Sequence, residues 1–171
     1  RLGFALRKCC LTCLIFVMFY WRCLEEEFLP FLPLILNQLL SAITQDVTVA
    51  DVSFEDMEMR SDIQMVEMED GWVAVRSDAV EEQSSACQLV MLIVEKMQEH
   101  FYPYVEETVN SLSPLMDSTH EDVRSFAMVA MPELVRSTAK ATSPDRSALS
   151  ALSEFVIGRL LNAVESEGDL D

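Results

Sequence analysis

Apolar side chains recur at intervals of three and four residues in five separate stretches, and this spacing constrains the fold of the chain more than any other feature. Each stretch places its apolar residues on one face of a helix and leaves the other face polar. The stretches are residues 29–43, 86–97, 104–116, 123–135 and 149–164. The sequence contains no alternating apolar and polar pattern of comparable length. It therefore predicts an all-α fold.

The chain also repeats itself. Residues 28–32 (FLPFL) align with residues 101–105 (FYPYV) at an offset of 73, and the helical stretches that contain Ala86 and Ala127 align at an offset of 41. A period of about 41 residues is typical of HEAT and armadillo repeats, in which each unit contains a pair of helices. One helix pair cannot bury its apolar face alone, so neighbouring pairs must stack into an α-solenoid.

The difference between the two offsets indicates an insertion inside the first repeat. We expect about two and a half HEAT repeats, the last of them truncated, and this leads us to expect a fragment of a longer solenoid. The predicted division is residues 24–44 for helix A, 45–78 for an acidic insertion, 79–100 for helix B, 103–140 for the second repeat and 146–167 for helix A of the third.

The prolines make a further prediction about these helices. Pro103 lies near a predicted helix start, where proline is tolerated because the first N–H groups of a helix have no intrahelical partner. Pro33, Pro114 and Pro132 lie deeper. We expect them to kink their helices, because proline removes an intrahelical hydrogen bond and clashes with the preceding turn.

The charge is strongly negative and unevenly distributed. The chain has 12 Lys and Arg against 29 Asp and Glu, a net charge of −17. This excludes a general nucleic-acid binder, because contacts to phosphates need a basic face. The insertion 45–78 alone holds ten acidic residues and two arginines, but Met and Trp residues are interleaved with them. Such adaptable side chains favour docking on the solenoid or on a basic partner, and a flexible linker is the alternative.

Residues 1–23 differ from the remainder, since they carry four basic residues, no acidic ones and four of the five cysteines. The uncharged run 9–21 is short for a membrane span, which needs about 20 apolar residues. Membrane association through this run is therefore only an alternative. A zinc site is not expected, because the two histidines lie far away, and we interpret the cysteines as reduced thiols. The segment does not look like a helix pair, and our hypothesis is a mis-predicted exon or intron read-through.

Patterns for catalysis are weak. Ser118, His120 and Asp122 are close in sequence, but no glycine-rich oxyanion loop accompanies them. The sequence also lacks a P-loop and a G-x-G-x-x-G motif. We therefore expect no enzyme activity, no cofactor and no metal ion.

Four motifs, in order, resemble the middle of importin-β-superfamily nuclear transport receptors of the karyopherin beta three (importin five) type. They are EEFLPFLPLIL, MEDGWVAV, EEQSSACQLV and DVRSFAMVAMPELV, and the resemblance covers residues 24–171. It implies that Asp117 and Arg124 belong to the ladder of hydrogen bonds that commonly links neighbouring HEAT repeats. The equivalent position of the first helix B holds Gln83, where a basic residue is expected. Family members are several times longer, and their amino-terminal Ran-binding region is not represented here.

The resemblance implies a nuclear import receptor that binds basic, nuclear-localisation-type cargo and is released by Ran–GTP, in the cytoplasm and nucleus. Nucleoporins would be further partners, with no direct nucleic-acid contact and no membrane. The alternative function is a generic HEAT-repeat scaffold or adaptor for the assembly of protein complexes. The expected partner-binding residues lie in the insertion and on the polar face of helix B: Asp51, Glu55, Asp56, Glu58, Asp62, Glu67, Glu69, Asp70, Trp72, Glu81, Glu82, Gln88 and Glu95.

Overall fold

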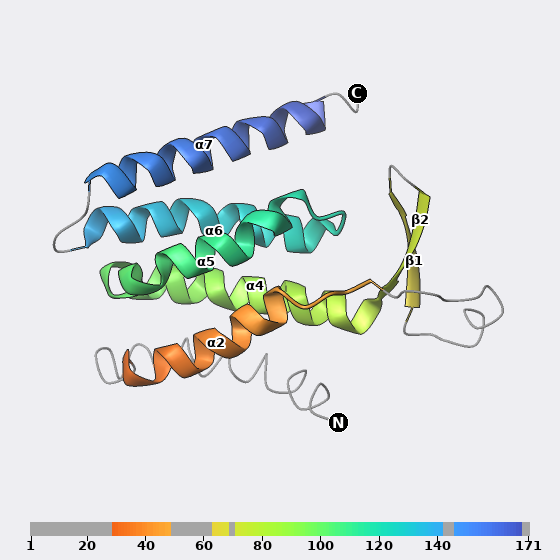
Figure 1. The fold of residues 1–171 in the computed structure, drawn as a ribbon, viewed down its shortest axis with the longest axis horizontal. Coiled ribbons are helices and arrows are strands. Elements are labelled where there is room, and N and C mark those ends of the chain that lie inside the picture. Colours follow the sequence, from red (N-terminus) through yellow and green to blue (C-terminus); the bar gives the residue numbers. More distant parts are fainter. Residues whose placement is uncertain (1–28, 49–62, 69–70, 142–145, 169–171) are drawn as a thin grey trace.

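The structure is a computed structural model, and it describes residues 29–48, 63–68, 71–141 and 146–168. Over these residues the chain is mainly helical, with one pair of strands (Figure 1). The α-helices are α2 (Leu32–Ile43), α4 (Ser77–Met97), α5 (Val105–Leu112), α6 (Glu121–Lys140) and α7 (Arg146–Gly168). The 3₁₀-helices are η2 (Gln98–Tyr104) and η3 (Ser113–Asp117), and the strands are β1 (Ile63–Met68) and β2 (Gly71–Arg76).

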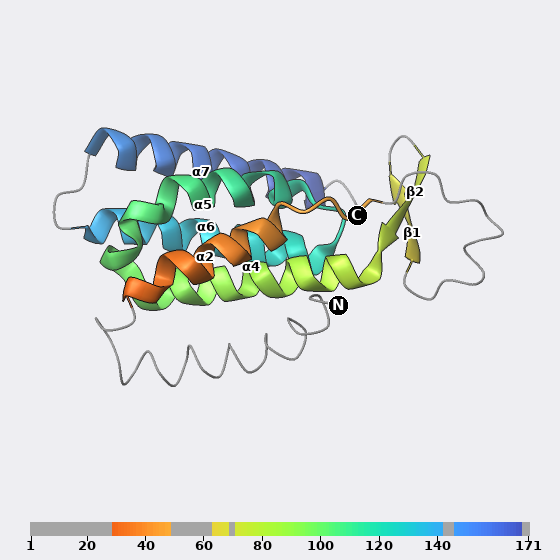
Figure 2. The ribbon, with the colours of Figure 1, turned by 60° about the horizontal axis from the view of Figure 1, so that its bottom comes forward.

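The helices form two layers. Figures 1 and 2 show α2, α5 and α7 in one layer and α4 and α6 in the other. Helix α4 packs against α2 and α6, and α6 packs against α5 and α7. Consecutive helix pairs therefore stack side by side, and the predicted all-α solenoid is confirmed.

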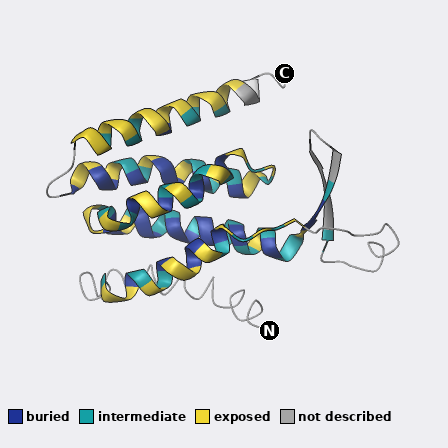
Figure 3. Cartoon of the chain, in the orientation of Figure 1, coloured by how far each residue is buried: buried dark blue, intermediate teal, exposed yellow. Residues whose placement is uncertain are grey.

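The apolar stripes form one continuous core between the layers (Figure 3). Leu36 of α2, Val90 of α4 and Met131 of α6 are each exposed by no more than 1%. Burying a side chain of this size contributes about 1.5–3 kcal/mol. Cys87 belongs to the same core, and burial raises the pKa of its thiol to about 12, so this thiol is protonated at neutral pH and unreactive.

Helix α7 packs with one face only. Val156 is buried, whereas Ile157, Leu161 and Val164 on the outer side are 58–68% exposed. By length and composition, residues 146–165 of α7 would be able to cross a membrane, and only 6% of this stretch is buried. A span is a poor explanation, because Arg159 lies inside this stretch and bonds to the neighbouring repeat. A charged residue inside a spanning helix is costly.

The expectation of proline kinks was wrong at two of the three positions. Pro33 lies in the first turn of α2, and Pro114 lies in the first turn of η3. Both positions tolerate proline, because the N–H groups there need no intrahelical acceptor. The helical stretch expected over 104–116 is instead divided into the end of η2, α5 and η3. Only Pro132 lies inside an α-helix, α6.

The insertion contains two strands that the sequence pattern did not predict. Strands β1 and β2 pair antiparallel, with a register that runs from Ile63↔Arg76 to Met68↔Gly71. Each strand has only six residues, and β1 lacks a clean alternation of apolar and polar residues, so periodicity gave little signal. The local signal was the Asp70-Gly71 dipeptide, which is common in tight hairpin turns. The hairpin lies beyond the first turn of α4 (Figure 1).

One residue at the junction between α4 and η2 has an unusual backbone conformation. Gln98 has a φ of +45°, and it is the only non-glycine residue with a positive φ in the described part of the chain. Its carbonyl accepts a hydrogen bond of 2.6 Å from the Ser137 hydroxyl, and its side-chain oxygen accepts one from Lys140. Both donors belong to α6. A strained residue persists where its surroundings hold it in place, and here two bonds from the next repeat do so.

Candidate partner-binding surface

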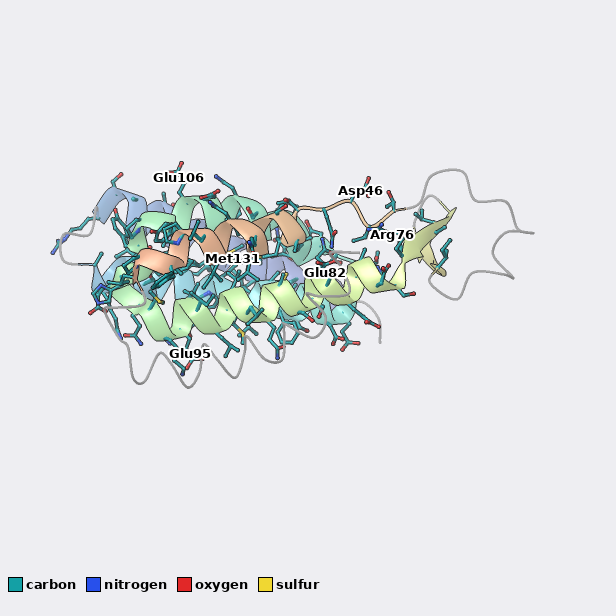
Figure 4. The ribbon with its side chains drawn as sticks, turned by 90° about the horizontal axis from the view of Figure 1, so that it is seen from below. Asp46, Arg76, Glu82, Glu95, Glu106 and Met131 are labelled. Atoms are coloured by element: carbon teal, nitrogen blue, oxygen red, sulfur yellow. The ribbon has the colours of Figure 1, made fainter. Side chains whose placement is uncertain are left out.

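The predicted residues of α4 fall on two sides of the helix. Glu81, Gln88 and Glu95 are spaced by seven residues, so they lie within an arc of about 40° at 100° per residue. Glu82 is rotated from Glu95 by about 140°. Glu81 is exposed, and the others are half-buried. Figure 4 shows Glu95 and Glu106 on opposite sides of the molecule. The structure thus brings three of the four residues into one line and separates Glu82 from them.

The line of Glu81, Gln88 and Glu95, called the outer line of α4 below, also contains Leu92, which lies within about 20° of Glu81 around the helix. Glu95 forms an ion pair of 2.5 Å with Lys96, and both side chains are more than a third exposed. An exposed pair of this kind contributes at most about 1 kcal/mol. The carboxylate of Glu95 can therefore exchange Lys96 for another cation at little cost.

An acidic hollow of about 410 Å³ lies where the first turns of α4 and α6 meet. Glu81 contributes to it from α4, and Glu121 and Asp122 contribute from α6. Ser84, Ser85, His120 and Val80 complete the lining. The hollow combines carboxylates with hydroxyl groups, so its chemistry suits a cationic side chain.

Most of the predicted residues of the insertion lie outside the described part of the chain. This applies to Asp51, Glu55, Asp56, Glu58, Asp62, Glu69 and Asp70. Glu67 and Trp72 are cross-strand neighbours in the hairpin register. Their role as partner-binding residues stays a prediction.

The start of the insertion is bonded to α4 and to the last residue before α4. The Gln45 side chain donates to the carbonyl of Ala79 over 3.3 Å, and the backbone N–H of Arg76 donates to the carbonyl of Val47 over 3.0 Å. Asp46 accepts two bonds from Thr48, and these lower the pKa of its carboxyl group. Residues 45–48 and Arg76 are thus held in place by hydrogen bonds, so a freely flexible linker does not describe the part of the insertion next to α4.

Gln83 of α4 and Arg124 of α6 occupy equivalent positions of the two helix pairs, and the side chain of each donates a hydrogen bond to a backbone carbonyl. Arg124 donates to the carbonyl of Ser118 over 2.9 Å. Gln83, which is 4% exposed, donates to the carbonyl of Ile43 over 2.7 Å. Each bond joins one of the first two turns of helix B to the end of the preceding helix A or to the residue that follows its 3₁₀ extension. Gln83 stands where the resemblance leads us to expect a basic residue, and its position on an apolar face of the helix was the signal for this buried hydrogen bond.

Asp117 bonds to the next repeat. Its carboxylate accepts a bond of 2.5 Å from Arg159 of α7, and the same guanidinium nitrogen donates to the Ser113 carbonyl over 3.1 Å. Asp117 and Arg124 therefore contact different partners. Their assignment to a HEAT ladder stays a prediction.

Comparisons with known proteins bear on this arrangement. No protein-family model matches the chain. Importin subunit beta-3 of Saccharomyces cerevisiae is 24% identical over 151 residues, which are 85% of this chain and 14% of that protein. The crystal structure of Kap121p matches 86% of this chain and 14% of its own, with a TM-score of 0.75 and 22% identity. Over most of its length the chain is similar in sequence to importin subunit beta-3 and shares the fold of Kap121p.

The chain spans about 14% of the length of the relatives that it matches. At 22% identity, the likeness to Kap121p shows a shared fold. A second structure, Kap121p bound to RanGTP, matches 86% of this chain and 15% of its own at the same TM-score and identity. Further structures show Kap121p bound to Pho4p and to Nup53p. The matched proteins are named as an importin and a karyopherin.

Two of the residues considered for catalysis, Ser118 and His120, take part in the turn before α6. The Ser118 hydroxyl accepts the backbone N–H of His120 over 3.2 Å, which closes the turn before α6. Burial lowers the pKa of His120. Within the described ranges, no group of three His, Cys, Asp or Glu residues is arranged to hold a metal ion.

Replacing Asp117 by alanine should lower the free energy of unfolding only slightly. The Asp117 side chain is 71% exposed, and exposed ion pairs contribute about 0.2–1 kcal/mol. Replacing Arg159 should cost more, because the Ser113 carbonyl also loses its donor. Urea titration followed by circular dichroism measures both. Equal losses for the two variants would contradict a role of Arg159 beyond the ion pair.

Proposed function

We propose that this chain is part of a nuclear import receptor that binds basic cargo proteins and is released from them by Ran–GTP. The observation that carries the proposal is the match of its stacked helix pairs to Kap121p over 86% of the chain. Kap121p has been seen bound to Pho4p and to RanGTP. A receptor of this kind works in the cytoplasm and the nucleus and exchanges partners without chemistry of its own.

The charge of the chain supports a basic partner. The acidic insertion and the outer line of α4 would attract segments rich in lysine and arginine by long-range electrostatics. The carboxylates of Glu81 and Glu95 would take individual cationic side chains, and Gln88 between them would accept a hydrogen bond. Because such attraction is screened, binding should weaken as the salt concentration rises.

The test is a pull-down with the receptor polypeptide that carries this segment. We expect it to capture a basic, nuclear-localisation-type cargo at moderate salt and to release that cargo when Ran–GTP is added. Ran–GDP is the matched control and should leave the cargo bound. Capture that is indifferent to Ran–GTP would contradict the proposal and favour a generic HEAT-repeat scaffold.

A further inference from the structure

Gln98 adopts a backbone conformation that normally requires glycine. Its φ is +45° and its ψ is −116°. These are close to the angles of the first central position of a type II′ turn, which glycine occupies because it has no Cβ to crowd the backbone. Holding another residue in such a sparsely populated region is unfavourable, and it persists only where the surrounding structure fixes it. The groups that fix Gln98 therefore control the backbone of this junction.

All four hydrogen-bonding groups of Gln98 have partners, two in each repeat. Its backbone N–H donates to the Val94 carbonyl, and its side-chain NH₂ donates to the Glu95 carbonyl over 3.2 Å. Both acceptors belong to α4. Its carbonyl accepts a bond of 2.6 Å from the Ser137 hydroxyl, and its side-chain oxygen accepts one from Lys140. Both donors belong to α6, so one residue joins the ends of the two B helices.

The bond from Ser137 differs from the usual bond of a helical hydroxyl. Hydroxyl groups within helices often donate to the carbonyl four residues earlier in the same helix. The side chains that do so in this structure include Thr108, Ser111, Thr138 and Ser153. Ser137 is 1% exposed and donates instead to Gln98, 39 residues away in the chain. Its hydroxyl is thus committed to the junction between the repeats.

The conformation of Gln98 is coupled to the arrangement of the helices. Because φ describes rotation about the N–Cα bond, a change in its sign redirects η2 and α5 relative to α4. Met97 and Phe101, on either side of Gln98, are both buried in the core. The chain between these two residues has little slack, so the φ of Gln98 and the angle between α4 and α5 must change together.

We propose that Gln98, Ser137 and Lys140 form a latch that sets the angle between the first and second repeats. In the closed state the two bonds from α6 hold Gln98 at a positive φ. In the open state both bonds are broken, Gln98 takes the negative φ that non-glycine residues favour, and α5 turns relative to α4. Lys140 is exposed, whereas Ser137 is enclosed. This inference does not depend on the proposed function.

The test is solution NMR of the full chain and of a variant that carries Ser137→Ala and Lys140→Met, which removes both donors. Residual dipolar couplings report the direction of α4 relative to α5, and the one-bond Hα–Cα coupling of residue 98 reports the sign of φ. We expect a negative φ and a changed helix direction in the variant. Amide exchange in η2 should accelerate about fivefold to 150-fold, as expected when an enclosed carbonyl loses its donor.

Thr138→Val is the matched control. It also removes an enclosed hydroxyl group of α6, but one that donates to Leu134 within the same helix. It should leave φ at residue 98 positive and the helix direction unchanged. Lys140→Met alone changes an exposed residue and should accelerate exchange in η2 about twofold to tenfold. If the double variant does not fold, this single variant decides the question.

Three outcomes overturn the proposal. A folded double variant that keeps a positive φ and the original helix direction would show that the turn itself holds Gln98. Equal changes in Thr138→Val would show a general loosening of α6. Where only Lys140→Met can be measured, unchanged exchange in η2 would show that the bond from Lys140 holds nothing in place.

Discussion

Replacing Phe101 by alanine should lower the free energy of unfolding by about 3–5 kcal/mol, the cost of removing a large aromatic side chain from a closed core. Phe101 is 0% exposed and lies in η2, between helix B of the first repeat and helix A of the second. Its ring meets that of Tyr104 at a centroid distance of 5.8 Å and an angle of 58°. The variant therefore loosens the junction at which the two repeats meet.

Phe31→Ala is the matched control, because it makes the same chemical change at a residue that is 57% exposed. We expect it to change the free energy of unfolding by no more than about 0.5 kcal/mol. Urea denaturation, followed by circular dichroism of the helices, gives both values. Similar losses for the two variants would show that the junction is not a packed part of the core.

Gln83→Glu should have the second-largest effect on stability. The Gln83 side chain is 4% exposed, and its amide donates a hydrogen bond to the Ile43 carbonyl. A carboxylate cannot donate, so at neutral pH a buried charge would face a carbonyl oxygen with no hydrogen between them. Losing the donor alone costs about 1–3 kcal/mol, which is the loss expected for Gln83→Leu. The glutamate variant should lose more than the leucine variant at pH 7.

The sign of the pH dependence separates the two causes of the stability loss, which are the missing hydrogen-bond donor and the buried charge. Burial should raise the pKa of the new carboxyl group above its unfolded value of about 4.3. Its contribution is therefore most favourable below that pH and is lost as the pH rises through the folded pKa. Acidification should narrow the difference between the two variants, as measured by urea titrations at several pH values. Gln88→Glu, half-buried on the same helix, should show little change, and an equal pH response there would contradict the account.

Helical periodicity predicted the core because the core faces of α2, α4 and α6 are aliphatic and evenly spaced. Leu36, Val90 and Met131 all lie on predicted stripes and are buried. The breaks between helices were harder to predict. Pro114 starts η3 after α5 has ended, and a stripe of the same spacing continues across both elements. Periodicity alone cannot distinguish one kinked helix from two consecutive segments.

The polar groups of the candidate surface were only partly predictable. Spacing by seven residues placed Glu81 and Glu95 on one side of α4, but the same polar face was expected to include Glu82, which is rotated away. The role of Gln83 was not predictable for a different reason. Its role depends on the Ile43 carbonyl, which is 40 residues away in the chain, and no local pattern reports such a contact.

The central claim is that the acidic surface of this chain attracts basic protein segments, and its most direct test is a binding titration. A fluorescent, lysine- and arginine-rich nuclear-localisation peptide is added to the full chain, and anisotropy gives the dissociation constant. The test variant carries Glu81→Lys and Glu95→Lys. The control carries Glu106→Lys and Glu107→Lys, which make the same change of net charge at exposed positions of α5, and Glu106 lies opposite Glu95 (Figure 4).

We expect the α4 variant to weaken binding about tenfold, which corresponds to about 1.4 kcal/mol, and the α5 variant to weaken it much less. Binding of the unmodified chain should also decline as salt rises. Equal losses for the two variants would mean that only the total charge matters, and no loss in either would mean that the peptide does not use this surface. Either result would contradict the claim.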